Sequence, residues 1–184
     1  AAIAHARRLV AEGADIVDIG AESTRPGAQP VGPEEELVRL LPVLESLREL
    51  RVPLSVDTRR PQVMRAAIVA GADMINDVEG FRSPEAIAAV SGSRAACCVM
   101  HMLGDPLTMQ RAPGYRDVVS EVDEWLRGRT RALQGAGVTA SRIVASSMLS
   151  SITMSAPAAT ASRTSASVRA STSTVNRFPQ RART

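Results

Sequence analysis

Short apolar runs alternate with segments of helical periodicity over residues 1–144. The runs are almost continuously apolar, as in strands buried on both faces, and the segments between them repeat apolar residues every three or four positions. This alternation is typical of βα units around a parallel sheet. The predicted strands are 16–19, 54–56, 72–75, 95–100 and a fifth that begins at 142–144. The predicted helices are 2–13, 33–50, 61–71, 83–91 and 115–137.

Proline and glycine mark several helix boundaries. Pro33 and Pro61 stand at the first positions of two predicted helices, where the missing amide hydrogen is tolerated and the fixed φ angle suits the helix. Gly13 and Gly71 end two others, as glycine often does. Three glutamates directly after Pro33 favour a helix N-terminus there, because acidic side chains interact well with its partial positive charge.

Polar residues follow four successive predicted strands at the point where each strand ends. A (β/α)₈ barrel collects active-site residues from the carboxyl ends of several strands, whereas an open doubly wound sheet gathers them at one switch point, usually with a glycine-rich phosphate turn. The sequence has no such turn, so we expect an α/β fold that is a partial (β/α)₈ barrel of about five βα units. The polar residues are Glu22, Ser23, Thr24, Asp57, Thr58, Asn76, Asp77 and His101.

The composition fits one globular domain. Of 184 residues, 45% are hydrophobic and 22% charged, which is too apolar for a disordered chain. No apolar run reaches about 18 residues and the N-terminus does not resemble a signal peptide, so we expect a cytoplasmic protein without membrane contact. The two cysteines, Cys97 and Cys98, are adjacent in an apolar run, which predicts reduced core residues rather than a disulfide framework or a cysteine-rich metal site.

Charge divides the chain into two parts. Residues 1–144 carry 17 arginines and all 19 acidic residues, a net charge of −2, whereas residues 145–184 carry five arginines and no acidic residue. The second part also holds 10 serines and six threonines and lacks glycine. We therefore predict a barrel domain over 1–144 and a Ser/Thr/Arg-rich tail over 145–184 that is either disordered or translated out of frame.

Taken alone, the candidate residues have ordinary structural interpretations. Asp57 precedes Pro61 by four residues and fits a helix N-cap as well as a ligand-binding role. Asn76 and the aspartate after it suit a turn, Arg25 suits a solvated loop, and His101 suits a core position. The residue types by themselves leave these alternatives open.

Four segments in order resemble the dihydropteroate synthases. They are DIGAESTRPG at 18–27, LSVDT at 54–58, MINDVEG at 74–80 and VMHMLGDPLTM at 99–109. The resemblance implies a (β/α)₈ barrel that joins para-aminobenzoate (4-aminobenzoate) to 6-hydroxymethyl-7,8-dihydropterin pyrophosphate and releases pyrophosphate in folate biosynthesis. It also implies a magnesium-assisted transferase, a sulfonamide target and a homodimer.

The same resemblance assigns roles to six positions. Asp57 and Asn76 would hydrogen-bond the pterin, and Met100 would contact its ring. Asp57 would also be catalytic, because its carboxylate can stabilise positive charge that develops on the pterin methylene as pyrophosphate leaves. Thr24 and Arg25, with Pro26 shaping their loop, would hold the pyrophosphate and the aminobenzoate.

The chain also departs from the family pattern. The family's first strand, with its metal-binding asparagine, would precede Ala1, so no metal ligand is assigned within the chain. The family motif after Val144 is replaced by the tail, and the chain has no lysine to supply the family's lysine. We interpret 145–184 as out-of-frame translation, with a genuine disordered tail as the alternative, and expect the chain alone to expose two sheet edges, fold poorly and lack activity.

Two other functions remain open at this point. The pterin-binding domain of a corrinoid-dependent methyltransferase shares the barrel and the Asp57 and Asn76 positions, but the STRPG segment at 23–27 is more typical of the synthases. A non-enzymatic remnant with a basic tail would attract nucleic acid weakly and in a salt-dependent way. The tail contains one aromatic residue, Phe178, and so offers no platform for stacking bases.

Overall fold

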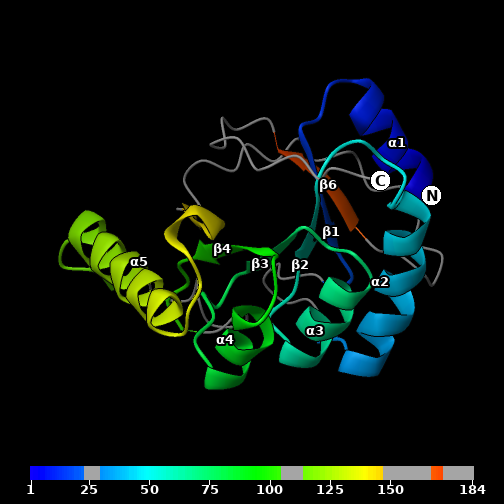
Figure 1. Ribbon diagram of the computed structural model, residues 1–184. Helices are drawn as coiled ribbons and strands as arrows, with labels where there is room; N and C mark the ends of the chain where they lie inside the picture. The colour runs from blue at the N-terminus through cyan, green and yellow to red at the C-terminus, as the bar shows by residue number, and fades with distance from the viewer. Residues whose placement is uncertain (23–29, 105–113, 147–166, 172–184) are drawn as a thin grey trace.

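A layer of helices covers one face of a six-stranded sheet in the computed structural model, which describes residues 1–22, 30–104, 114–146 and 167–171 (Figure 1). The helices are α1 (Ala2–Ala11), α2 (Pro33–Leu47), α3 (Pro61–Val69), α4 (Pro84–Ser91) and α5 (Val118–Gly135). The strands are β1 (Ile16–Gly20), β2 (Leu54–Asp57), β3 (Met74–Asp77), β4 (Ala96–Met100), β5 (Ile143–Ser146) and β6 (Ser167–Ser171). A short 3₁₀ helix, Ala140–Arg142, precedes β5.

The first five strands are parallel and neighbour one another in chain order, β5-β4-β3-β2-β1. Helices α2, α3 and α4 lie side by side on the same side of the sheet (Figure 1). A doubly wound sheet would reverse its strand order and carry helices on both faces, whereas a (β/α)₈ barrel does neither. The described sheet therefore confirms the predicted partial barrel.

The predicted elements are all present, with ends that differ by a few residues. Pro33, Pro61 and Pro84 each open a helix. The Ser83 side chain caps α4 by accepting the Ala86 amide at 3.1 Å, and Asp117 caps α5 by accepting two amides of its first turn. These local contacts explain why helix starts were readable from the residues alone.

A single hydrophobic core lies between the sheet and the helices. Alternate strand residues, such as Val56 on β2 and Ile75 on β3, are fully buried against fully buried side chains of α2 and α3. Cys97 belongs to this core, and both cysteines are free and buried, as predicted. Because side chains alternate along a strand, the residues between these core positions face the other side of the sheet, which is the inner side of a barrel.

Residues 167–171 differ from the expectation of a disordered tail. They form β6, which pairs antiparallel with β1, from Ile16 opposite Ser171 to Gly20 opposite Ser167. Composition alone favours disorder for this segment, whereas the edge of β1 offers backbone donors and acceptors that order a short extended segment. One of the two sheet edges that we expected to be exposed is therefore covered by this strand.

The turn after β3 has an unusual backbone. Gly80 has a φ of +65° and Phe81, whose side chain is fully buried, has a φ of +54°. Asp77 accepts the amides of Glu79 and Phe81 at 2.9 and 2.7 Å. Arg129 of α5 donates to the carbonyl oxygens of Gly80, at 3.0 Å, and of Phe81. Contacts from β3 and α5 thus hold the turn in a positive-φ conformation that residues other than glycine rarely adopt.

Replacing Gly80 by alanine is expected to lower the free energy of unfolding by at least about 2 kcal/mol. A Cβ at this position would lie 2.7 Å from the backbone oxygen of Met100, and the positive φ adds strain. Urea denaturation followed by circular dichroism measures the change. Gly128, inside α5 with open space where a Cβ would lie, is the matched control, since Gly128→Ala should stabilise by about 0.5–1 kcal/mol. Equal effects at both sites would contradict the prediction.

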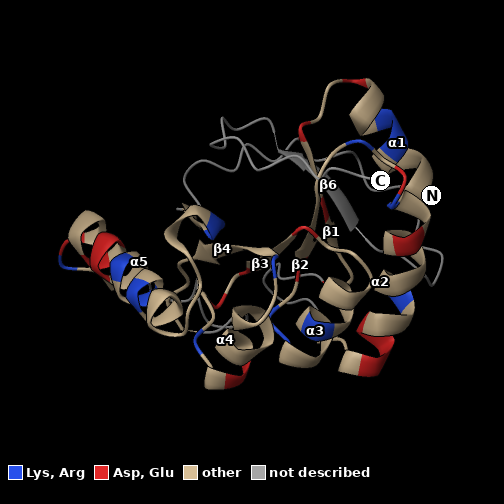
Figure 2. Cartoon of the chain, viewed as in Figure 1, with Lys and Arg blue, Asp and Glu red and all other residues tan. Residues whose placement is uncertain are grey.

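Charged residues lie mainly on the helices and loops, with acidic and basic positions interleaved on α5 (Figure 2). Asp123 and Arg127, for example, form an exposed ion pair of 2.6 Å one turn apart on that helix. None of the helices in the described part of the chain is both long enough and apolar enough to cross a membrane.

Candidate active site

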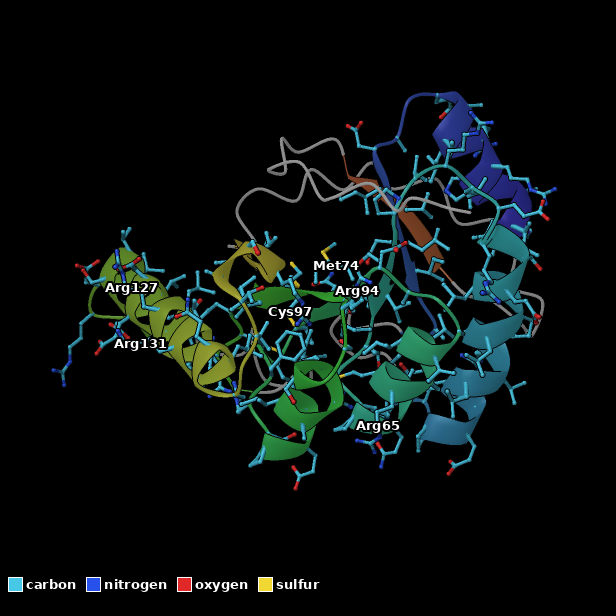
Figure 3. The ribbon with its side chains drawn as sticks, in the orientation of Figure 1. Arg65, Met74, Arg94, Cys97, Arg127 and Arg131 are labelled. Atoms are coloured by element: carbon cyan, nitrogen blue, oxygen red, sulfur yellow. The ribbon has the colours of Figure 1, made fainter. Side chains whose placement is uncertain are left out.

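Three predicted site residues lie on neighbouring strands at the carboxyl end of the sheet. Asp57 ends β2 and is opposite Asn76 of β3 in the strand register. Asn76 is in turn opposite Cys98 of β4, so Met100 lies two residues further along that strand. All three project on the face of the sheet opposite to the core, on the same side as Met74 (Figure 3). The parallel register thus gathers residues that are far apart in the sequence.

Asp57 is buried, with 9% of its surface exposed. The interpretation of this residue as a helix N-cap is wrong, because the N-cap of α3 is Arg60 and that position makes no side-chain capping hydrogen bond. The strand end also fixes the local backbone, since the Thr58 amide donates to the Asn76 carbonyl oxygen at 3.0 Å. A carboxylate is therefore held at a rigid position on the inner face.

Asn76 leaves a polar atom unsatisfied. Its side-chain oxygen is buried and has no hydrogen-bond partner among the described residues, and the same holds for the hydroxyl oxygen of Ser55 on β2. A buried acceptor without a donor costs free energy, so such atoms in a native structure call for an explanation. On the inner face, beside Asp57, this oxygen is available to accept a hydrogen bond from a donor group.

Several acidic side chains influence the inner face. Burial raises the pKa of Cys98 to about 12, and the nearby carboxylates of Asp18, Asp57 and Asp77 add to the increase. The Cys98 thiol is therefore neutral and unreactive at physiological pH. The inner face is consequently a place where a positively charged or hydrogen-bond-donating molecule would be stabilised.

Asp77 has a structural role rather than a role on the inner face. Its carboxylate is buried and holds the turn described above, and burial raises its pKa to about 6 despite the two amides that it accepts. Asp77 is the last residue of β3 and its side chain holds the turn that follows, whereas its neighbour Asn76 faces the opposite side of the sheet.

Asp77 is expected to make stability depend on pH. Its pKa is higher in the folded chain than the 3.8 of an unperturbed aspartate, so the folded state binds the proton more tightly. The contribution of the Asp77 proton to the free energy of unfolding is complete below pH 4 and is lost as the pH rises through about 6. The free energy of unfolding changes by about 3 kcal/mol over this range. The difference in the free energy of unfolding between the wild-type chain and Asp77→Asn, measured by urea denaturation from pH 4 to 7.5, should fall with rising pH. A difference that stays constant over this range would contradict the prediction.

A network of five charged residues lies beside the strand ends and could not be predicted from the sequence. Arg59 and Arg60, directly after β2, both bind Glu22, which follows β1. Arg59 also binds Glu79 at 3.0 Å, and Arg60 binds Glu36 of α2 at 2.7 Å. The only available signal was the Arg59-Arg60 pair next to Asp57 and Thr58, because the glutamates belong to three other segments of the chain.

His101 lies in a group of aromatic and cationic side chains rather than at the inner face. Its ring centroid is 5.9 Å from those of Tyr115 and Trp125, and burial and the nearby Arg82 lower its pKa. The Arg82 guanidinium stacks 5.0 Å from the centre of the Trp125 ring. His101 packs against these rings but is only half-buried, so it is not the core residue that the sequence suggested.

The remaining predicted site residues, Thr24, Arg25 and Pro26, lie outside the described residues. Within the described ranges no group of three or more His, Cys, Asp or Glu side chains is placed to hold a metal ion. The described side chains therefore do not form a magnesium site by themselves. The chemistry that they offer is hydrogen bonding to a polar ring and electrostatic stabilisation of positive charge.

Comparison with known proteins agrees with this arrangement. Residues 1–150 match the family described as pterin binding enzyme. The dihydropteroate synthase of Neisseria meningitidis serogroup B is 46% identical over 145 residues, which cover 78% of this chain and 51% of that protein. The chain thus spans about half the length of the curated relatives that it matches.

Solved structures show the same similarity. The crystal structure of Burkholderia cenocepacia dihydropteroate synthase complexed with 7,8-dihydropteroate is 56% identical, with a TM-score of 0.73, and the match covers 78% of this chain and 51% of that one. The Xanthomonas albilineans dihydropteroate synthase with 4-aminobenzoic acid is 50% identical, with a TM-score of 0.72, and the match covers 78% and 50%. Both similar proteins therefore bind small molecules of the kind that the resemblance implies.

Proposed function

The chain belongs to the pterin binding enzyme family, and from this premise we propose that its inner sheet face is the pterin-binding portion of a dihydropteroate synthase. The proposed reaction joins 6-hydroxymethyl-7,8-dihydropterin pyrophosphate to 4-aminobenzoate and releases pyrophosphate. The observation that supports it most is the buried side-chain oxygen of Asn76, which has no hydrogen-bond partner among the described residues and lies beside the buried carboxylate of Asp57.

A pterin edge matches these two side chains chemically. The ring system presents N–H and amino donors together with ring-nitrogen acceptors at fixed spacing. The Asp57 carboxylate accepts two hydrogen bonds, and the Asn76 amide both accepts and donates. Because both side chains come from rigid, paired strands, their spacing is set before the ligand binds, and Met100 offers an apolar contact at the same rim.

The same carboxylate has a second role in the proposed reaction. Departure of pyrophosphate breaks a C–O bond and leaves partial positive charge on the pterin methylene, which the amine of 4-aminobenzoate then attacks. Asp57 is buried, so its negative charge acts through a medium less polar than water and stabilises that positive charge strongly. The role of Asp57 is electrostatic, and the proton that the attacking amine loses as the C–N bond forms passes to solvent.

Further parts of the proposed site rest on the family pattern. Thr24, Arg25 and Pro26 would hold the pyrophosphate and the aminobenzoate in the segment after Glu22. Mg²⁺ bound together with the pyrophosphate would neutralise part of the negative charge of this leaving group. The described residues do not form a cluster of metal ligands, so this magnesium would depend on the substrate and on other parts of the enzyme.

Turnover by residues 1–184 alone is expected to be undetectable. The chain spans about half the length of its relatives, and a (β/α)₈ site draws its catalytic side chains from strands around the whole barrel. A phosphate-release assay coupled to pyrophosphatase, at several chain concentrations, tests this expectation. A rate that increases in proportion to the chain concentration would contradict it.

The sequence of the tail, residues 145–184, is proposed not to derive from the pterin-binding family, although residues 145–146 complete β5 and residues 167–171 pair with β1. The family match ends at residue 150, and the chain has no acidic residue after Glu124 and no glycine after Gly137. The proposed origin is translation in a shifted frame, and the coding DNA tests it. A downstream family sequence that is intact in the same frame as the tail would contradict a frameshift.

Isothermal titration tests the binding proposal. Purified chain is titrated with 6-hydroxymethyl-7,8-dihydropterin pyrophosphate, with and without Mg²⁺, and inorganic pyrophosphate alone is the control ligand. Circular dichroism on the same sample establishes that the chain is folded. Saturable binding of the pterin ester, much tighter than that of pyrophosphate, is expected. A folded chain that binds both ligands equally, or neither, would refute the proposed pterin site.

A further inference from the structure

Arg60 makes contacts with three separate segments of the chain. Its guanidinium binds both oxygens of the Glu22 carboxylate, at 2.7 and 3.0 Å, and one oxygen of Glu36 at 2.7 Å. It also donates to the backbone oxygen of Val31. The amide of Val31 in turn donates to Glu22 at 3.1 Å. Both backbone groups of Val31 are therefore bound to the Glu22–Arg60 pair.

These contacts lie at the two ends of one segment. Glu22 directly precedes residues 23–29 and Val31 closely follows them, while Arg60 stands three residues after Asp57. We propose that Arg60 and Glu22 form a clamp that fixes the two ends of this segment relative to each other and to Asp57. Arg60 and Glu22 are thus positioning residues, and their effect on substrate rests on the proposed function.

Burial makes the clamp rigid. The side chains of Glu22, Arg60 and Glu36 are only 9%, 16% and 1% exposed. Buried ions must be paired and hydrogen-bonded with good geometry, because removing one partner leaves an uncompensated charge. A planar guanidinium that binds a carboxylate through two hydrogen bonds fixes the relative orientation of the two side chains. An ammonium group that makes a single hydrogen bond leaves this orientation free.

The charge state of Glu22 supports the same conclusion. Burial alone would raise its pKa, but hydrogen bonds from Arg60 and Arg59 outweigh this effect and hold the pKa at about 2. The Glu22 carboxylate is therefore ionised throughout the physiological range. Arg59 adds a second cation and extends the network to Glu79 of the turn after β3, but it does not contact Val31.

Amide hydrogen exchange at Val31 tests the clamp without any ligand. In Arg60→Met the Val31 amide should exchange at least about tenfold faster, while the Ile75 amide in β3 keeps its rate. Arg60→Lys, which keeps the charge but not the two-bond geometry, should be intermediate. Arg65→Met is the matched control, because Arg65 is exposed on α3 and points away from the sheet (Figure 3). Unchanged Val31 exchange in Arg60→Met, or a change shared by Ile75, would overturn the clamp.

Two ligands separate positioning from a general structural role. 6-Hydroxymethyl-7,8-dihydropterin should contact Asp57 and Asn76, whereas its pyrophosphate ester also depends on residues 23–29. Arg60→Met is expected to weaken binding of the pyrophosphate ester at least about tenfold. Binding of 6-hydroxymethyl-7,8-dihydropterin should weaken less than about threefold. Equal losses for both ligands would contradict a positioning role. If the wild-type chain binds neither ligand, the proposed function fails, and Val31 exchange still decides whether the clamp exists.

Discussion

Asp57→Ala is expected to weaken binding of 6-hydroxymethyl-7,8-dihydropterin pyrophosphate at least about 100-fold. The variant removes hydrogen bonds from a charged, buried acceptor, and such bonds contribute about 1.5–3 kcal/mol each. It also leaves hydrogen-bond donors of the pterin ring without a partner, because the bound ligand has displaced the water that could otherwise accept from them. Isothermal titration of the wild-type and variant chains under the same conditions measures the change.

Two further variants make this result specific. Asp57→Asn keeps the shape and one acceptor but loses the charge, so its affinity should lie between those of the wild-type chain and Asp57→Ala. Asp123→Ala removes a carboxylate that is exposed on α5 and pairs with Arg127, and it should leave the affinity unchanged. An Asp57→Ala chain with unchanged circular dichroism and wild-type affinity would exclude Asp57 from the pterin site.

Phe81→Ala is expected to lower the free energy of unfolding by about 3–5 kcal/mol. Phe81 is among the largest fully buried side chains and belongs to the hydrophobic core, so its truncation leaves a cavity beside the turn after β3. The remaining alanine still has to adopt a positive φ, while the packing that compensated for this strain is gone. Urea denaturation followed by tryptophan fluorescence measures the loss.

The matched control removes apolar atoms where they are exposed. Val69 ends α3 and is 87% exposed, so Val69→Ala should change the free energy of unfolding by less than about 0.5 kcal/mol. If Phe81→Ala were as mild as Val69→Ala, the turn would not be a rigid part of the core. The turn would then not help to fix the end of β3, where Asn76 lies.

Local sequence patterns determined the elements because each depends on near neighbours. Pro33 and Pro61 start helices through their own backbone geometry. The leucines of α2, including Leu40, Leu44 and Leu47, recur on one face and are buried there as their spacing predicts. The barrel topology also followed from the sequence, because polar residues at the ends of successive strands imply one common rim.

Residues 167–171 of the tail show what local patterns miss. The composition of the tail is that of a disordered segment, but residues 167–171 pair with β1. Strand pairing depends on an available edge elsewhere in the fold, which composition does not describe. The same limitation applies to the turn after β3, since the positive φ of Phe81 is held by Arg129, 48 residues away.

The sequence by itself determined the order of the strands and helices, the family resemblance and the candidates Asp57, Asn76 and Met100. Only the tertiary structure decided that Asp57 is not a helix cap, that the Asn76 side-chain oxygen lacks a partner among the described residues, and that Arg60 joins Glu22, Val31 and Glu36. The physical reason is range: propensity and periodicity act within a few residues, whereas burial and ion pairing depend on segments that only the folded sheet brings together.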